Sequence, residues 1–355
     1  MNLEITTYTQ ALAKSMHSAM AEHDNTIIMG QGVDDFKGIF GTTLNLHKKF
    51  GRNRVFDVPL AEEGTTGIAI GAALNGLYPI QTHIRADFAL VCMNQLINLA
   101  SKYRYMFGGR FEVPMLIRLV VGRSWGQGAQ HSQSLQSTFS HFPGLTVIMP
   151  SHPDTILSSY AYAVAEYKNP VISIEHRLMY DLEFKIGSYA KRHNPLHSSY
   201  VVRRGHDVTI VATSIMVLES LRAAEHLFET AGISCEIIDL HSTSHPQQEL
   251  VIESVSRTKK LIIADTSWQA YGVGAEVCRW ILEKDPSILC TPVKTIGMAP
   301  APCPTAKSLE DIYYPNLSTL SHDIATMVTG NTDHGIPLPS ENSMADVYKR
   351  FKGPF

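Results

Sequence analysis

Short apolar runs of the length of buried strands alternate with helical segments along this chain, and this alternation constrains the fold more than any other feature. The strand-like runs are TIIMG (26–30), YPIQTHI (78–84), VPMLIRLVVG (113–122) and PVISIEH (170–176). Between them lie segments with apolar residues at helical spacing, such as 7–23. Strands that are apolar on both faces and separated by helices are typical of a parallel sheet covered by helices. We therefore predict an α/β protein.

The alternation is interrupted near residue 181 and resumes with DVTIVAT at 207. Because the segment between is polar and rich in turn-forming residues, it indicates a linker. We predict two domains, 1–183 and 198–330, each a mostly parallel sheet covered by helices, joined by a linker at 184–197. A long helix is expected over 89–109, which ends at a glycine pair. The polar segment 331–355 is expected to be extended unless a partner orders it.

Composition restricts the class of protein further. Hydrophobic residues make up 44% of the 355 and charged residues 18%, as in an ordinary globular protein. The formal net charge of −3 gives no argument for nucleic acid or an anionic membrane as a partner. The five cysteines are scattered without a CxxC pair, which fits a reducing compartment and offers no metal framework. No apolar run approaches the ~18 residues of a membrane span, so we expect a soluble cytoplasmic protein.

Common catalytic motifs are missing from the sequence. No GxGxxG follows a strand, and GxxxxGK[ST] and HExxH do not occur. Dinucleotide, P-loop and zinc-protease functions therefore have little support.

Two polar stretches follow apolar runs and are candidates for a site. VPLAEEG (58–64) contains the glutamate pair Glu62 and Glu63, and WGQGAQHSQS (125–134) is a glycine-rich loop with His131 beside Gln130. Ligands of α/β sheets bind at the carboxyl ends of strands, where such loops lie. From residue type alone, however, an exposed glutamate pair and a solvated loop histidine are the commoner outcomes.

Six motifs occur in the order in which a known family carries them. They are PLAEEG, ADF, KYRYMFGG, GAQHSQS, FPGLTVIMPSHPDT and NPVISIEHRLMY. This order resembles the β subunit of two-component 2-oxo acid dehydrogenases, the thiamine-diphosphate E1 components of the pyruvate, branched-chain and acetoin dehydrogenase complexes. The resemblance spans about residues 4–329. It implies a transketolase-like pyrimidine-binding domain followed by a transketolase C-terminal-like domain.

The resemblance assigns roles to single residues. Glu62 matches the glutamate that hydrogen-bonds N1′ of the aminopyrimidine ring and activates the cofactor, whereas Glu63 matches a variable position. Phe88 of ADF matches the aromatic residue that packs on this ring, and Leu60 matches a residue beside it. His131 matches the active-site histidine that stabilises the intermediate or assists acyl transfer to lipoamide. We therefore expect Glu62 and His131 to be catalytic.

The resemblance also predicts partners. The pyrophosphate–Mg²⁺ motif, GDG followed some thirty residues later by NN, does not occur in this chain. In the family it lies on the α subunit, so we expect an α₂β₂ heterotetramer in which the α subunit holds Mg²⁺ and this chain holds no metal for it. A lone chain should be inactive towards its 2-oxo acid. A lipoyl acyltransferase or other carrier is the expected acyl acceptor, and 163–169 is where relatives often bind a structural K⁺.

Several positions depart from the family pattern. Gln31 and Gly32 stand where acidic residues are usual, and Arg85 occupies a position that is usually neutral or aromatic. Arg85 is either part of an ion pair or a cation lining the substrate channel for an anionic or phosphorylated substrate, and Gln130 is a second candidate substrate contact. Two alternatives to the dehydrogenase remain open, a two-component transketolase-type transferase of two-carbon units and a non-catalytic assembly subunit.

Overall fold

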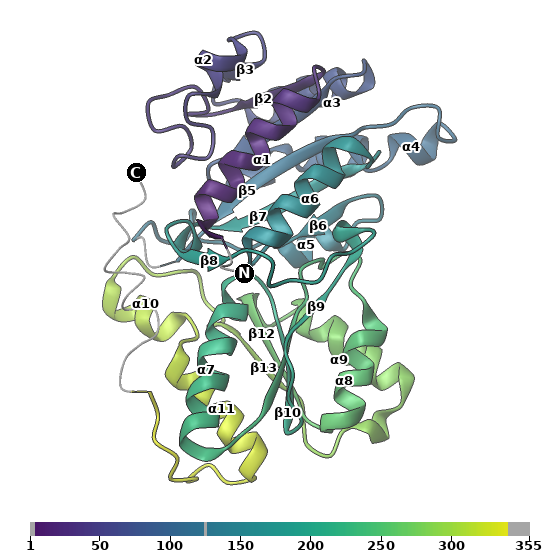
Figure 1. The fold of residues 1–355 in the computed structure, drawn as a ribbon. Coiled ribbons are helices and arrows are strands. Elements are labelled where there is room, and N and C mark those ends of the chain that lie inside the picture. Colours follow the sequence, from purple (N-terminus) through teal and green to yellow (C-terminus); the bar gives the residue numbers. More distant parts are fainter. Residues whose placement is uncertain (1–3, 124–125, 340–355) are drawn as a thin grey trace.

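The computed structural model describes residues 4–123 and 126–339 and forms two α/β domains, one above the other in Figure 1. The upper domain contains the first part of the chain to about residue 185, and the lower domain begins at β9. Each domain is built on its own sheet. The predicted fold class is confirmed.

The sheet of the upper domain has six strands in the order β3-β2-β4-β5-β7-β6, and all its pairs are parallel. Its strands are β2 (Thr26–Gly30), β3 (Val55–Asp57), β4 (Tyr78–His83), β5 (Met115–Val121), β6 (Thr146–Ile148) and β7 (Pro170–His176). Five of these strands, all except β3, are buried at every residue, as the continuous apolar runs predict.

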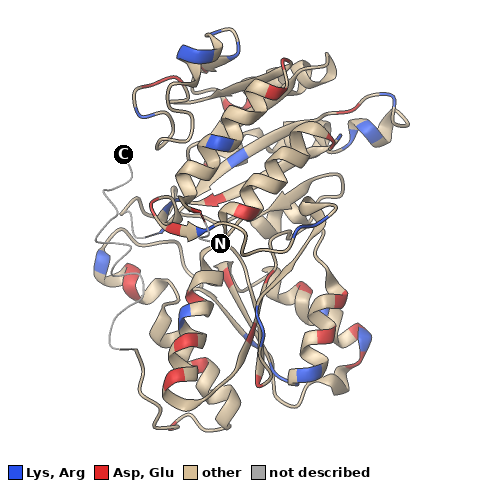
Figure 2. Ribbon diagram, viewed as in Figure 1, with Lys and Arg blue, Asp and Glu red and all other residues tan. Residues whose placement is uncertain are grey.

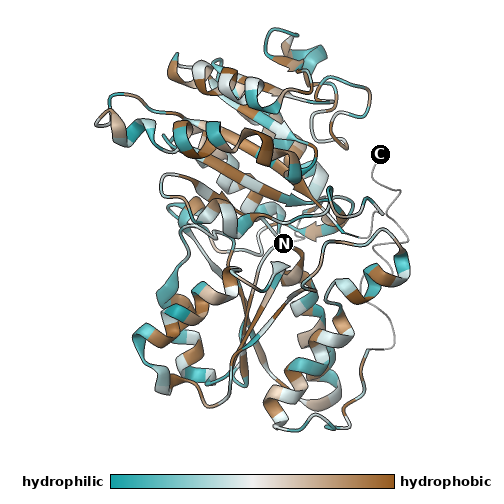
Figure 3. Cartoon of the chain, turned by 180° about the vertical axis from the view of Figure 1, so that it is seen from behind, coloured by the Kyte–Doolittle hydropathy of each residue, from teal (hydrophilic) through white to brown (hydrophobic). Residues whose placement is uncertain are grey.

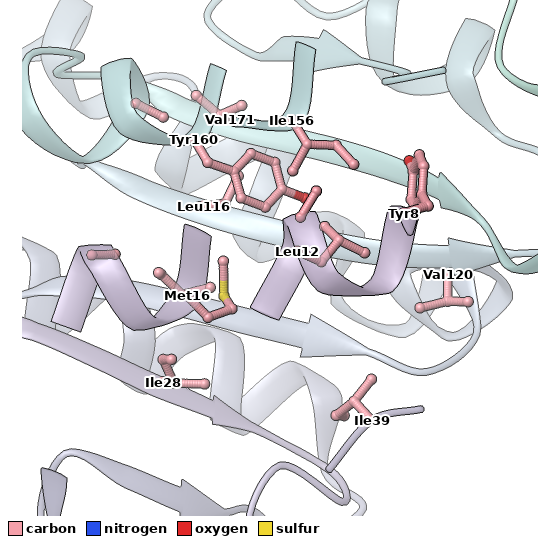
Figure 4. Packing of buried hydrophobic residues seen from close by; sticks show 14 of the residues in the cluster. Tyr8, Leu12, Met16, Ile28, Ile39, Leu116, Val120, Ile156, Tyr160 and Val171 are labelled. Atoms are coloured by element: carbon pink, nitrogen blue, oxygen red, sulfur yellow. The ribbon is translucent and has the colours of Figure 1, made fainter. Parts of the chain in front are cut away.

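Helices cover both faces of this sheet. On one face, α1 (Tyr8–Glu22) and α6 (Pro153–Ala165) form a core with the strands. Figure 4 shows Leu12 and Met16 of α1 in one cluster with Ile156 of α6 and the strand residue Leu116. A capping box at Thr7 satisfies the first amides of α1. On the other face lie α3 (Glu62–Leu74) and two irregular helices, η1 (Ala86–Cys92) and η2 (Gln95–Ala100).

The expected long helix over 89–109 is wrong. The segment forms the 3₁₀-helix η1, the π-helix η2 and the short α4 (Tyr103–Met106). Its buried residues explain the division, because Ala86, Ala89 and Cys92 recur every three residues, the period of a 3₁₀-helix. Leu96 and Ala100 then recur at a spacing of four. The first part therefore turns more tightly than an α-helix.

The upper sheet contains a sealed ion pair. Arg118 of β5 and Glu175 of β7 have fully buried side chains, and two hydrogen bonds of 2.7 and 2.8 Å join them. Tyr160 and Tyr180 also donate to the carboxylate, and Arg118 donates to the Thr42 hydroxyl. A buried pair is tolerated only when its remaining polar atoms find such partners. Elsewhere the charges lie mainly on helices and loops and leave the strands mostly uncharged, as Figure 2 shows.

The lower domain has five strands in the order β13-β12-β10-β11-β9, of which only β9 is antiparallel to its neighbour. Its elements are β9 (Tyr200–Arg203), β10 (Val208–Ala212), α7 (Ile215–Ala231), β11 (Cys235–Asp239), α8 (Gln248–Thr258), β12 (Leu261–Trp268), α9 (Val273–Lys284), η5 (Pro286–Ile288), β13 (Lys294–Met298), α10 (Lys307–Tyr313) and α11 (Leu317–Thr329). In Figure 1, α7 and α11 lie on one side of the strands and α8 and α9 on the other. In Figure 3 the strands are mostly brown, the colour of hydrophobic residues, whereas the helices carry both brown and teal residues. This difference is expected because the strands are buried and each helix has one exposed face.

Hydrogen bonds join the two domains through the end of β6. Met149 N–H donates to the carbonyl of His241 at 2.7 Å, and Thr243 N–H donates to that of Val147 at 3.0 Å. The Ser151 hydroxyl donates to the buried carboxylate of Asp239 at 2.5 Å. The loop after β11 therefore follows the edge strand of the upper sheet.

The segment predicted as a linker, 184–197, contains the end of β8 (Glu183–Lys185), which pairs with β1 (Ile5–Thr7), and the 3₁₀-turn η4 (Pro195–His197). The short helices α2 (Leu46–Phe50), α5 (Gln136–Ser140) and η3 (Arg177–Met179) complete the upper domain. The predicted tail, 331–355, has neither helix nor strand over 331–339, and its remainder lies outside the described residues.

Candidate active site

A cavity of about 380 Å³ opens at the carboxyl ends of β2, β4 and β5. It is lined by Gln31, Gly32, Asp35, Lys37, Ile39, Phe40, Glu62, His83, Ile84, Arg85, Phe88, Gln127 and His131. These residues come from the segments that follow the strands, as expected for the binding edge of a parallel sheet. Four residues predicted from the sequence, Glu62, Arg85, Phe88 and His131, lie together in this cavity.

Glu62 is the first residue of α3 and is half-buried. Gln31 Nε2 donates to its Oε1 at 3.3 Å. The amide groups of the first helical turn and the positive end of the helix dipole favour a carboxylate at this place. Glu63 is exposed, lies outside the cavity and accepts from Gln95 at 3.2 Å. The two neighbouring glutamates therefore have different environments.

The aromatic rings of Phe88 and His131 meet edge to face, with centroids 5.2 Å apart. Phe88 belongs to η1, whereas His131 belongs to the loop after β5. Asp87 ties these segments together, because its Oδ1 accepts from the Gln133 backbone at 3.2 Å and from the Gln133 amide group at 2.9 Å. Asp87 thus positions the loop of His131 against Phe88, a role that the sequence analysis missed.

His83, at the end of β4, is a further cavity residue that the sequence analysis missed. Its side chain is buried, and its Nε2 has no hydrogen-bond partner in the part of the chain that the structure describes. Burial lowers the pKa of His83 to about 4, although Glu62 acts in the opposite direction. The imidazole is therefore neutral at pH 7. An unpaired polar atom in the wall of a cavity is available to a ligand.

Arg85 lies two residues after His83 and is 6% exposed. Its Nε donates to Gln127 Oε1 at 2.5 Å, and its Nη1 donates to the Ile84 carbonyl at 2.9 Å. Burial lowers the pKa of Arg85 to about 10, so the guanidinium is charged at neutral pH. The side chain is enclosed in the cavity wall of the single chain, and its role, as part of an ion pair or as a contact to the substrate, stays a prediction.

Two predicted residues lie outside this cavity. Leu60 is 83% exposed in the turn between β3 and α3. Gln130 is exposed and lines a neighbouring hollow with Phe88 and Trp268. Neither touches the space between Glu62 and His131, and their proposed roles remain predictions.

Within 4–123 and 126–339, no group of three or more His, Cys, Asp and Glu side chains could hold a metal ion. All five cysteines are unpaired thiols. In the same ranges, no helix has the length and apolar character required to cross a bilayer.

Comparison with known proteins identifies the family. Residues 5–182 match the transketolase pyrimidine-binding domain, and residues 198–320 match the transketolase C-terminal domain. The pyruvate dehydrogenase E1 component subunit beta of Saccharomyces cerevisiae is 33% identical over 321 residues, which cover 88% of this chain and 87% of that protein. The chain belongs to the E1 β-subunit family. The resemblance read from the six motifs is confirmed.

Other relatives agree with this assignment to the E1 β-subunit family. The Bos taurus pyruvate dehydrogenase subunit beta is 34% identical over 318 residues, 88% of each chain. The acetoin:2,6-dichlorophenolindophenol oxidoreductase subunit beta of Cupriavidus necator is 33% identical over 323 residues, 88% of this chain and 94% of that one. A solved split-gene transketolase, described as an inactive β4 tetramer, has a TM-score of 0.73 at 21% identity and covers 90% of this chain and 97% of its own. This last match bears on the fold alone.

Proposed function

We propose that this chain is the β subunit of a thiamine-diphosphate-dependent 2-oxo acid dehydrogenase and supplies the pyrimidine half of its active site. The observation that carries the proposal is the shared cavity of Glu62, Phe88 and His131. These residues arrive from three different segments of the chain, and the motifs that contain them match the E1 β pattern. The proposed reaction is oxidative decarboxylation of a 2-oxo acid and transfer of the acyl group to a lipoyl or other carrier.

The residues present fit thiamine diphosphate. The Glu62 carboxylate would accept from the aminopyrimidine ring, and the ring of Phe88 offers an apolar surface for it. The unpaired Nε2 of His83 gives the cavity wall a further polar atom for a ring nitrogen or amino group. When bound, the cofactor supplies the carbon nucleophile and the electron sink for decarboxylation.

The chain's own residues hold and move protons at defined atoms. Gln31 Nε2 keeps the Glu62 carboxylate turned toward the cavity. The Glu62 carboxylate would hold or exchange a proton at a ring nitrogen of the bound cofactor and would thereby set the acid–base state of that ring. His131, braced by Phe88 and by the loop that Asp87 holds, presents its imidazole to the substrate as a hydrogen-bond donor or acceptor.

An exposed apolar surface next to the site supports a partner subunit. Around Glu62, Leu60 and Ile68 are 83% and 66% exposed, and Val91 of η1 is 53% exposed. The glycines of α3, such as Gly67, have open space where a Cβ would lie. Exposed apolar residues beside bare helix backbone suit close packing of another chain. We assign this surface to an α subunit that completes the site and holds Mg²⁺, in an α₂β₂ heterotetramer, and we keep a structural K⁺ near 163–169 as part of the proposal.

The proposal is tested by purifying the tagged chain from its own cells and by reconstituting it with the co-purified partner. We expect a partner that carries GDG…NN, and we expect 2-oxo acid decarboxylation only when both chains and thiamine diphosphate are present. Full activity of the chain alone would contradict the split site. A ketose donor that is used without any lipoyl carrier would favour the transketolase-type alternative, and a complex that needs this chain but not Glu62 would favour an assembly subunit.

Gly67→Leu tests the partner surface separately. No atom lies within 4 Å of the position that a Cβ would occupy at Gly67, so the lone chain should fold and keep or gain stability. The larger side chain should nevertheless block the approach of the α subunit and abolish co-purification. Glu229→Leu on the exposed side of α7 is the matched control and should leave assembly unchanged. Normal assembly of the Gly67 variant would remove α3 from the proposed interface.

A further inference from the structure

The loop that carries His131, residues 126–135, is held by contacts from both domains. On the side of the upper domain, Asp87 accepts from the backbone and side-chain amides of Gln133. The loop leads into α5, whose first residue, Gln136, has a fully buried side chain. The position of a reacting side chain on a loop depends on such fixed points.

The lower domain holds the end of this loop through residues of β12. Gln136 Nε2 donates to Asp265 Oδ1 at 2.7 Å, and the same oxygen accepts from the Thr266 amide at 2.8 Å. The Ser134 hydroxyl donates to Gln136 Oε1 at 2.6 Å and lies 3.2 Å from the Thr266 hydroxyl. Two residues from each domain thus form one hydrogen-bonded network at the end of the His131 loop.

The lower domain also meets the chain near the beginning of the loop. Arg123, two residues after β5, donates from Nη1 to the Pro315 carbonyl at 2.8 Å. Gly128 lies so close to Thr305 that a Cβ there would be 2.7 Å from the Thr305 hydroxyl oxygen. A side chain at Gly128 would therefore have to displace Thr305, and the φ of +70° also favours glycine.

Asp265 differs in its contacts from Asp239, a second buried carboxylate at the junction between the domains. Asp239 accepts from Ser151, which follows β6, so this bond joins the domains at a place outside the His131 loop. Asp265 instead bonds to Gln136, five residues after His131. Loss of the Asp265 bond should free the end of the His131 loop, whereas loss of the Asp239 bond should weaken only the junction.

We propose that Asp265 of the lower domain is a positioning residue for His131 and acts through Gln136. The proposal rests on the function proposed above, because it gives Asp265 a part in the reaction that His131 assists. Asp265 itself lies outside the lining of the cavity, and it fixes the end of the loop from which the imidazole reaches that cavity. A displacement of about 1 Å in a reacting group can cost about 10²-fold in rate. The lower domain then contributes to catalysis as well as to the junction.

Hydrogen–deuterium exchange of the full-length lone chain tests the contact without any reaction. Asp265→Leu and Gln136→Met each remove the bond of 2.7 Å, and both should make the amides of 126–136 exchange at least about threefold faster. Asp265→Asn keeps Oδ1, the atom that accepts from Gln136, and should behave as wild type. Asp239→Leu is the matched control and should leave exchange in 126–136 unchanged.

Kinetics of the reconstituted complex test the link to His131. The kcat per bound thiamine diphosphate should fall about 10- to 100-fold in Asp265→Leu and about tenfold in Gln136→Met, with KM changed less than about threefold. In a His131→Ala background, neither substitution should lower the remaining kcat more than about twofold, because residues that act through one group are not additive. If Asp265→Leu does not fold, Gln136→Met decides both measurements.

The outcomes separate this proposal from the function on which it rests. Unchanged exchange in 126–136, or kcat losses that persist in full in the His131→Ala background, would overturn the positioning role and leave the E1 β function standing. An equal fall in kcat for Asp239→Leu would also overturn it, since a general effect of the junction would then suffice. A wild-type complex that binds no thiamine diphosphate and decarboxylates no donor would overturn the proposed function, and with it a part for Asp265 in the reaction.

Discussion

Arg118 lies in a strand of the upper sheet and Arg85 lies just beyond the end of the neighbouring strand, and both are withdrawn from solvent, yet their surroundings differ. Arg118 lies within β5 and meets a carboxylate at two hydrogen bonds. Arg85 lies just beyond the end of β4, where neutral oxygen atoms hold it in the wall of a cavity. Arg118 is thus sealed and neutralised within the sheet, whereas Arg85 lines the cavity at the carboxyl edge of the same sheet.

The comparison extends to the two domains. The upper sheet leaves polar side chains at its carboxyl edge, where Glu62, His83 and His131 line one space. In the lower domain, the corresponding polar residues face the upper domain instead. There, Asp239 and Asp265 are buried and bonded to Ser151 and Gln136 across the junction. The carboxyl edge of one sheet thus forms the candidate site, while that of the other holds the domains together.

The largest expected effect is at Glu62. Glu62→Gln preserves the size of the side chain but removes the proton acceptor, so activity of the reconstituted complex should fall by about 10²- to 10⁴-fold. Steady-state kinetics with a saturating donor measure the loss, and the melting temperature of the chain should not change. Glu63→Gln is the matched control one residue away, outside the cavity. Equal losses for the two variants would remove the distinction between them.

Substitutions in the buried Arg118–Glu175 pair should change the stability of the fold and leave the choice of donor unchanged. Arg118→Met leaves the Glu175 carboxylate buried without its cation and should lower the free energy of unfolding by about 3–5 kcal/mol. Denaturant melts of the lone chain measure this change. The double variant Arg118→Met/Glu175→Leu should recover much of the loss, because it removes both charges. An unchanged free energy of unfolding for the single variant would contradict a structural role for the buried pair.

A pH effect is expected at the junction between the domains. Burial lowers the pKa of His241 to about 3, so the folded protein keeps this imidazole neutral. Because the unfolded chain binds the proton more readily, the stabilisation is complete above pH 6.5 and is lost as the pH falls toward 3. At pH 5 the loss is about 2 kcal/mol. His241→Asn, which suits the positive φ of 49°, should flatten the pH dependence of unfolding between pH 7 and 5.

Asp239 contributes in the opposite sense, because burial raises its pKa to about 6 and favours the protonated form in the fold. The His241 variant should therefore be compared with wild type at each pH, and not with a single reference. An unchanged slope would show that His241 does not titrate with unfolding.

The smallest effect is expected on the surface of α9. Arg279 pairs there with Glu276 and Glu283 at the helix surface, where water competes for each charge. Arg279→Ala should leave the melting temperature unchanged within error, in contrast with Arg118→Met. A loss as large as that of the buried variant would contradict the ranking of sealed above exposed pairs.

Much of the fold could be predicted from the sequence because burial on both faces leaves a simple pattern. TIIMG and PVISIEH coincide with β2 and β7. The short edge strand β3 and the pair β1–β8 were missed, since three residues cannot establish a period. The segment 89–109 was wrongly read as one helix, because its spacing of three and then four resembles an α-helical pattern.

From the sequence, residues could be assigned to the candidate site only where they lie within a recognisable family motif. Glu62, Phe88 and His131 came from the family resemblance, and the cavity brings them together. His83 and Gln127 had no such signal, because their importance depends on the strand end of β4 meeting the loop after β5 in space. His83 and Arg85 are two residues apart at the end of an apolar strand, and residues at this spacing share a face. This spacing was the one sign in the sequence that His83 could lie in the site.

The most direct test of the account is a cryo-electron microscopy structure of the complex with its α subunit and thiamine diphosphate. The account predicts one cofactor at each interface between this chain and the α subunit, with the aminopyrimidine ring within about 3 Å of the Glu62 carboxylate and against Phe88. A cofactor bound wholly within the α subunit, with the cavity of Glu62 and His131 turned to solvent, would contradict it.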